Sequence, residues 1–175
     1  MKQIVKIGIC ITILLVLSGC WSIRTNTKAP VFPDNAVSKL NVKQPVGLIN
    51  SSSRSGEIAI GKMTGVTVYG DLYKFTESSI SALMKIFEKQ NIEIDNSASK
   101  TLALSVYDAK SEMGEGYFII TTALRVRTGD DLEKEYVGMQ KYSYHFGTST
   151  AVEHSLAECL KQMLSDKDLI HYLEN

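Results

Sequence analysis

Cysteine and histidine are the residue types of this chain that could supply a nucleophile, a general base or a metal ligand. The sequence holds three of each, at Cys10, Cys20, Cys159, His145, His154 and His171. They form no CxxC, no HExxH and no other grouping at metal-ligand spacing. We therefore expect neither a metal site nor a bound cofactor.

Cys159 is the cysteine that could act as a catalytic thiol, with His154 or His145 as its base. However, it falls on the apolar stripe of a predicted helix, formed by Val152, Leu156, Cys159, Leu160 and Met163. At such a position a cysteine usually packs as a small hydrophobic side chain. Core packing is the favoured interpretation, a hydrolase using Cys159 is the less favoured one, and we expect a protein without enzymatic activity.

The N-terminus has the character of a targeting segment. Lys2 and Lys6 precede an eleven-residue run, 7–17, that is apolar apart from Gly8 and Thr12. As a helix this run would extend about 16 Å at 1.5 Å per residue. A bilayer core is about 30 Å thick and needs about 20 apolar residues. The length and the basic start match a secretory signal peptide rather than a membrane span.

Residues 17–20 read LSGC, which resembles the lipobox of bacterial lipoproteins. The resemblance implies cleavage between Gly19 and Cys20, removal of residues 1–19, and diacylglycerol on the Cys20 sulfur with a further acyl chain, typically palmitate, on its amine. Each buried CH₂ contributes roughly 0.8 kcal/mol, so two or three chains anchor a protein firmly. The alternatives are an ordinary signal peptide or an anchor helix with an incidental cysteine. Trp21, rather than Asp, follows Cys20, which favours the inner leaflet of the outer membrane, facing the periplasm.

The charge balance argues against a nucleic-acid partner. The 175 residues include 19 basic and 19 acidic side chains and are 44% hydrophobic. Without the first 19 residues, 17 basic side chains face 19 acidic ones. This is not the basic surface that attracts nucleic acid, and the length favours one folded domain.

The apolar pattern predicts where that domain begins and how it opens. Residues 20–44 have no periodicity and are predicted to be the acylated cysteine and a flexible tether, so the domain is predicted over 45–175. A strand is expected at 46–49, followed by an irregular connection at 55–75 with room for one short strand. Helical spacing then predicts a helix capped by Thr76, with an apolar stripe of Ile80, Leu83, Met84 and Phe87.

Alternating apolar residues predict three strands, at 101–107, 117–127 and 135–146, joined by glycine-containing connections and therefore antiparallel. In the last of them, Val137 and Met139 point away from the side of Tyr136, and a bulge near Gly138 is expected.

The C-terminal part is predicted to be helical. Thr150 to Glu153 forms a capping box, and Asp166 lies in the cap of a last short helix. The order β-α-β-β-β-α-α predicts an α+β two-layer domain with about four mainly antiparallel strands and two main helices on one face.

One set of polar and aromatic side chains could form a binding surface. Arg125 and Arg127 share a strand face and could pair with Glu133 and Glu135 across the hairpin. The tyrosines of the following strand are Tyr136, Tyr142 and Tyr144. An ordinary solvated face and a surface for an anionic headgroup or a sugar are both open alternatives.

Several segments, in order, resemble the YajG-like bacterial envelope lipoproteins. They are "VGLINSSSR", "SALMKIFEKQNIEI", "TLALSVYD", "LRVRTGDDLEKEYVG" and "AECLKQMLSDKDLIHYL". The resemblance spans residues 46–173, and the arrangement is also similar to that of LptE. It implies a lipid-anchored envelope protein with a binding or assembly-accessory role and an envelope protein partner, and it transfers no catalytic residue. A lipid- or glycan-binding carrier is the alternative.

Overall fold

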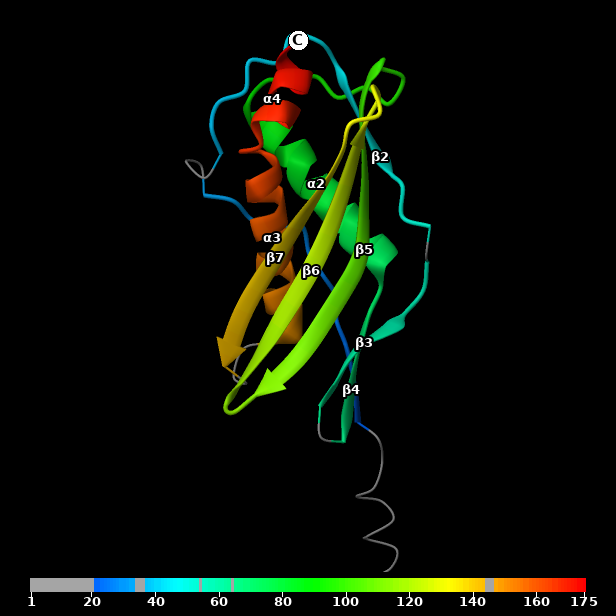
Figure 1. Ribbon diagram of the computed structural model, residues 1–175, viewed down its shortest axis with the longest axis vertical. Helices are drawn as coiled ribbons and strands as arrows, with labels where there is room; N and C mark the ends of the chain where they lie inside the picture. Colours follow the sequence, from blue (N-terminus) through cyan, green and yellow to red (C-terminus); the bar gives the residue numbers. More distant parts are fainter. Residues whose placement is uncertain (1–20, 34–36, 54, 64, 144–146) are drawn as a thin grey trace, which may run out of the picture.

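The computed structural model describes residues 21–33, 37–53, 55–63, 65–143 and 147–175. Its main sheet has the strand order β2 (Val46–Asn50), β5 (Lys100–Gly114), β6 (Tyr117–Thr128) and β7 (Glu133–Ser143). The β2–β5 pair is parallel and the other two pairs are antiparallel. Helices α2 (Leu72–Lys89) and α3 (Thr148–Met163) cover one face, and α4 (Lys167–Glu174) lies at one end (Figure 1). The predicted α+β two-layer architecture is confirmed.

The core lies between the sheet and the helices because the strands alternate as predicted. In β6, Phe118, Ile120, Leu124 and Val126 are buried on the helix side. Leu102, Leu104 and Val106 of β5 complete the same layer. This alternation assigns one face of every strand to the core and the opposite face to solvent.

Helix α2 begins earlier than predicted, since its N-cap is Asp71 rather than Thr76. The Asp71 carboxylate accepts hydrogen bonds from the backbone N–H groups of residues 73 and 74. Thr76 lies inside the helix, where its hydroxyl donates to Leu72 O and accepts from Val106 N–H of β5, at 2.9 and 2.8 Å. The added first turn buries Phe75, which makes the earlier start favourable.

A second, small sheet combines two strands from the 55–75 connection, where one short strand was expected, with a strand from the predicted tether. Its order is β1 (Trp21–Arg24), β4 (Val66–Gly70) and β3 (Ile58–Met63), with β1 and β4 parallel. It joins the main sheet where β3 crosses β5. A Cβ atom on Gly61 would lie 2.4 Å from Ser111 O, so only glycine fits this contact.

The described part of the predicted tether is packed on the domain instead of standing free. Residues 25–33 and 37–44 follow β1 along the helices. Lys28 N–H donates to Glu153 Oε1 at 3.0 Å, and Leu40 N–H donates to Gln90 Oε1 at 2.9 Å. Leu40 is 3% exposed. The apolar residues of this segment that pack on the domain are isolated and unevenly spaced along the chain. They therefore produce no periodic pattern in the sequence.

Two local predictions in the second half of the chain are wrong. Helix α3 has Gly147 as its N-cap without a side-chain hydrogen bond, so the predicted capping box does not form. Strand β7 has no bulge, since its pairing with β6 runs in continuous register from Tyr117–Ser143 to Arg127–Glu133. The bulge is instead in β5, which also continues to Gly114, through most of the predicted connection. The cap of α4 by Asp166 is confirmed.

Candidate functional site

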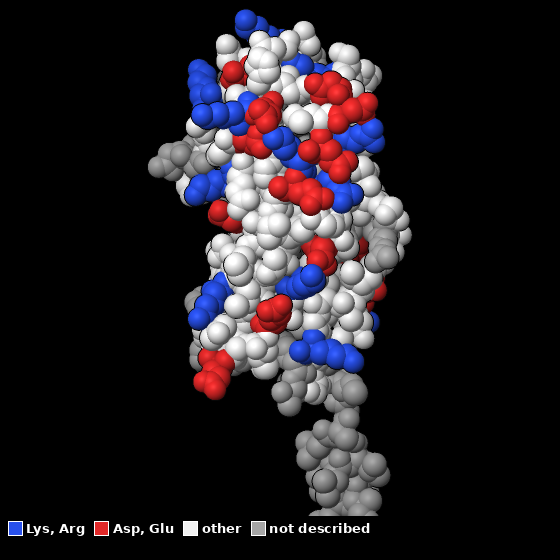
Figure 2. Space-filling model, in the orientation of Figure 1, with Lys and Arg blue, Asp and Glu red and all other residues white. Residues whose placement is uncertain are grey.

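The face of the main sheet that points away from the helices is covered by no other element of the described chain. We call it the open face. Its members come from all four strands and include Ile49, Tyr107, Ala123, Arg125, Glu133, Glu135, Val137 and Met139. Figure 2, which looks onto this face, shows an uncharged central area between charged groups. We take the open face as the candidate site.

The charged part of the open face is an ordered cluster around a bulge residue. The β5 bulge lies between Val106 and Asp108 and turns Tyr107 toward Arg125, whose guanidinium carbon lies 4.7 Å from the ring centroid. The Tyr107 hydroxyl donates to Glu135 Oε2 at 2.9 Å. Arg125 donates to Glu135 Oε1 from Nη2 at 2.7 Å, and its Nε lies 3.4 Å from Glu133. We call these four residues the Tyr107 cluster.

Hydrogen bonding sets the protonation states within the Tyr107 cluster. The bond from Arg125, followed by the bond from Tyr107, holds the pKa of Glu135 below its ordinary value. Burial and the bond to Glu135 raise the pKa of Tyr107. The carboxylate therefore stays ionised and the phenol stays neutral at neutral pH, which suits recognition rather than proton transfer.

The apolar part of the open face lies on the edge strand β7. Val137 is 50% exposed and Met139 is 61% exposed. Across the ladder they pair with Ala123 and Thr121 of β6. The open face therefore has an apolar part on its edge strand beside an ordered polar cluster on its middle strands.

The sequence-predicted surface is only partly brought together. Arg125 is on the open face and pairs with Glu135 as expected, whereas Arg127 pairs with Asp131. Tyr136 is on the helix side, 7% exposed, and its hydroxyl donates to Asp166 at 3.1 Å. The continuous register of β7 separates the tyrosines from the arginines.

The remaining tyrosines of that prediction do not add to the open face. Tyr142 is also on the helix side, where its ring stacks on Phe118 and its hydroxyl contacts His154. Tyr144, the cleavage site at Gly19 and the lipidation site at Cys20 lie outside the described residues. The sequence analysis did not single out Tyr107, although the alternation that buries Leu104 and Val106 already places it on the opposite face of the strand.

Cys159 lies in the interface between α3 and the sheet. It is fully buried, and its Sγ lies 3.5 Å from Thr122 Oγ1 and 3.4 Å from Tyr136 O. Burial raises the pKa of the thiol, so the thiolate is disfavoured. His154 contacts Tyr142 rather than the thiol. The predicted packing role of Cys159 is confirmed.

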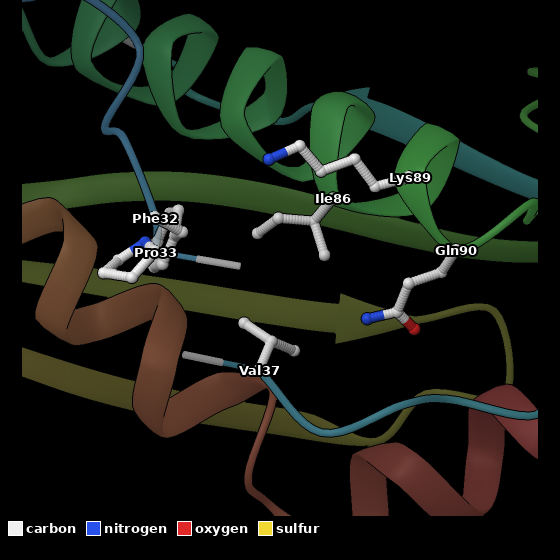
Figure 3. A pocket seen from close by; sticks show the side chains of 6 residues that line it. All are labelled: Phe32, Pro33, Val37, Ile86, Lys89 and Gln90. Carbon is white, nitrogen blue, oxygen red and sulfur yellow. The ribbon is translucent and has the colours of Figure 1, made fainter. Parts of the chain in front are cut away.

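An apolar groove lies between the 25–44 segment and α2. It has a volume of about 440 Å³ and is lined by Phe32, Pro33, Val37, Ile86, Lys89 and Gln90. Figure 3 shows the Val37 and Ile86 side chains turned into this space from opposite sides. The groove could hold an apolar group. The sequence did not indicate it, since one wall belongs to the predicted tether.

The structure describes residues 21–33, 37–53, 55–63, 65–143 and 147–175. Over these ranges no group of three or more His, Cys, Asp and Glu residues is arranged to hold a metal ion. None of the helices described there has the length and hydropathy needed to cross a bilayer.

Comparison with known proteins shows the fold. No family model and no curated protein matches the chain. Among solved structures, the crystal structure of protein XCC0632 from Xanthomonas campestris, of family DUF330, superposes with a TM-score of 0.52 and 15% sequence identity. The match covers 87% of this chain and 94% of that one. At this identity the likeness shows a shared fold.

Proposed function

We propose that this chain is a lipid-anchored, periplasm-facing envelope protein without enzymatic activity, and that its open face binds a protein partner in an assembly-accessory role. The anchor is Cys20, and the membrane is the outer membrane, as the LSGC motif and the following Trp21 favour. The shared fold with a bacterial protein is compatible with this origin.

The observation that carries the proposal is the composition of the open face. Protein interfaces are enriched in Tyr, Met and Arg, and they combine apolar with polar area. Met139 and Val137 supply the apolar part on the edge strand β7, and Tyr107 and Arg125 supply the polar part on the middle strands β5 and β6. Both parts are carried by hydrogen-bonded strands, so little conformational entropy is lost when a partner binds.

Co-purification with two matched variants of the acylated full-length protein tests the binding role. Val137→Glu places a charge in the apolar part of the open face, on the edge strand β7. Met84→Glu makes the same kind of change at a 38% exposed position of α2, on the opposite side of the sheet. We expect an envelope protein to co-purify, after crosslinking at native expression, with the wild type and Met84→Glu but not with Val137→Glu. Retention of that protein by Val137→Glu contradicts the proposal.

Metabolic labelling with a fatty acid tests the anchor separately. We expect the wild type to incorporate the label and Cys20→Ala to lack it. A Cys20→Ala variant that still incorporates label removes Cys20 as the acylated residue.

A lipid- or glycan-binding carrier is the second candidate, and the groove favours its lipid form. Phe32, Val37 and Ile86 offer apolar contacts in a volume of about 440 Å³. The glycan form has less support, because Tyr136 does not share a face with Arg125. We expect organic extracts of the purified full-length protein to contain lipid that Ile86→Trp excludes. A native mass spectrum showing only unliganded protein overturns this candidate.

A further inference from the structure

We propose that the end of the domain formed by β1, β4 and β3 is a membrane-contacting surface, which rests on the lipid headgroups without a spacer. This inference depends on the proposed acylation of Cys20. It concerns a part of the molecule remote from the open face, and it fixes how the domain is oriented on the bilayer.

No flexible residues separate the proposed anchor at Cys20 from strand β1. Trp21 is the first residue of β1 and follows Cys20 directly, so about 3.8 Å separates their Cα atoms. Strand β1 is fixed in the small sheet by its register, with Trp21 opposite Val66. Thr25, just after the strand, is held by hydrogen bonds from its N–H and Oγ1 to Tyr69 O, at 3.0 and 2.9 Å.

The register then determines which residues lie at the level of the headgroups. Because β1 and β4 are parallel, the start of β4 lies beside Trp21. Lys62 of β3 is opposite Thr67, one residue further along, and is exposed. Bilayer headgroup regions are about 5–8 Å deep on each side, which is comparable to the distance from Cys20 to this level. A lysine there suits an anionic lipid surface.

The opposite end of the domain is well separated from this surface. Gly61 packs against Ser111 of β5, and β5 runs from there back to Lys100. At about 3.3 Å per residue this part of the strand covers about 36 Å. Figure 1 shows β3 and β4 at one end of the long axis and α4 at the other. The domain therefore stands on end, and its open face is turned to the side rather than toward the bilayer.

Fluorescent labels at the two ends test this orientation on the acylated full-length protein. Lys62→Cys marks the membrane end, and Ser99→Cys, an exposed position just before β5, marks the far end. Labelling is selective because Cys159 is buried and the Cys20 sulfur is in a thioether. The vesicles contain phosphatidylethanolamine and phosphatidylglycerol, with a nitroxide quencher on some headgroups. We expect the quencher to remove most of the fluorescence of the label at position 62. The fluorescence of the label at position 99 should be unchanged.

A linker variant provides the matched control. Insertion of about twelve Gly and Ser residues between Cys20 and Trp21 adds a mean span of about 19 Å. It should reduce quenching at position 62 to the level at position 99, while acylation is unchanged. Thr67→Cys repeats the measurement on β4 in case Lys62→Cys does not fold.

The outcomes distinguish this inference from the anchor proposal. An intact mass without acyl chains contradicts the anchor. Acylated protein in which position 62 is quenched no more than position 99, or is unaffected by the linker, overturns the orientation.

Discussion

Replacing Gly138 by alanine tests how closely α3 is seated on β7. A Cβ atom at this position would lie 1.9 Å from Ser155 O and 3.1 Å from Cys159 Sγ. Ordinary contacts of a Cβ atom begin at about 3.4 Å. Since the nearest atom belongs to the helix backbone, no side-chain rotation relieves the clash, and α3 must move away by more than 1 Å.

The size of the effect follows from what that movement disrupts. Overpacking typically costs about 1–3 kcal/mol. The displacement also weakens two hydrogen bonds of the Ser155 hydroxyl, which donates to Gly138 O at 2.8 Å and accepts from Thr122 Oγ1 at 2.7 Å. Each is worth about 1 kcal/mol. We expect Gly138→Ala to lower the free energy of unfolding by about 3 kcal/mol. At about 2–4 °C per kcal/mol, the Tm falls by about 6–12 °C.

Urea and thermal unfolding followed by circular dichroism measure this change. Met139→Ala is the matched control, because it alters the next residue of the same strand on the exposed side and should change stability by no more than about 0.5 kcal/mol. If Gly138→Ala melts together with the wild type and Met139→Ala, α3 does not pack on β7 as described.

Three other predictions concern single groups. Asp166→Ala removes the N-cap of α4 and the acceptor of the Tyr136 hydroxyl, and should cost about 1–2 kcal/mol in urea unfolding; an unchanged midpoint would argue against that cap. Cys159 should react with a thiol reagent only after unfolding, because it is buried and its pKa is raised; rapid modification of the native protein would contradict this. The bond from Arg125 lowers the pKa of Glu135 below 4.5. The contribution of the Glu135 carboxylate to stability is therefore present above pH 4.5 and is lost as the pH falls through the lowered pKa. The stability difference between the wild type and Glu135→Gln should therefore shrink in acid, and a difference that widens on acidification would refute the pairing.

The regular elements could be predicted from the sequence because their faces are defined by local alternation. Leu102, Leu104 and Val106 mark a strand without any knowledge of its neighbours, and the same is true of Phe118 and Ile120 in β6. The cap of α4 was readable for the same reason, since Asp166 acts on residues two and three positions away.

The misplaced bulge shows where local information ends. Beside the register shift in β5, Val106 N–H donates to Thr76 Oγ1, a contact between residues 30 positions apart. Local alternation already places Tyr107 on the open face, whereas the register shift beside it depends on the pairing with β6. The pairing of Arg125 with Glu135 could be predicted across a short hairpin, whereas the side occupied by Tyr136 depended on the register of β7.

The packed 25–44 segment was missed for a different reason. Its side chains meet the helices singly, and its backbone groups bond to distant side chains such as Glu153 and Gln90. Such contacts create neither a helical nor a strand period. A segment of this kind resembles a flexible linker in sequence while it forms one wall of a groove.

Photo-crosslinking in growing cells tests the central claim most directly. A photoreactive amino acid at position 139 lies on the open face, and one at position 84 lies on the helix side. We expect a discrete adduct with one envelope protein from position 139 and not from position 84, and we expect Arg125→Glu to abolish it. Acylated protein that gives the same adducts from both positions, or none from position 139, contradicts a partner-binding role for the open face.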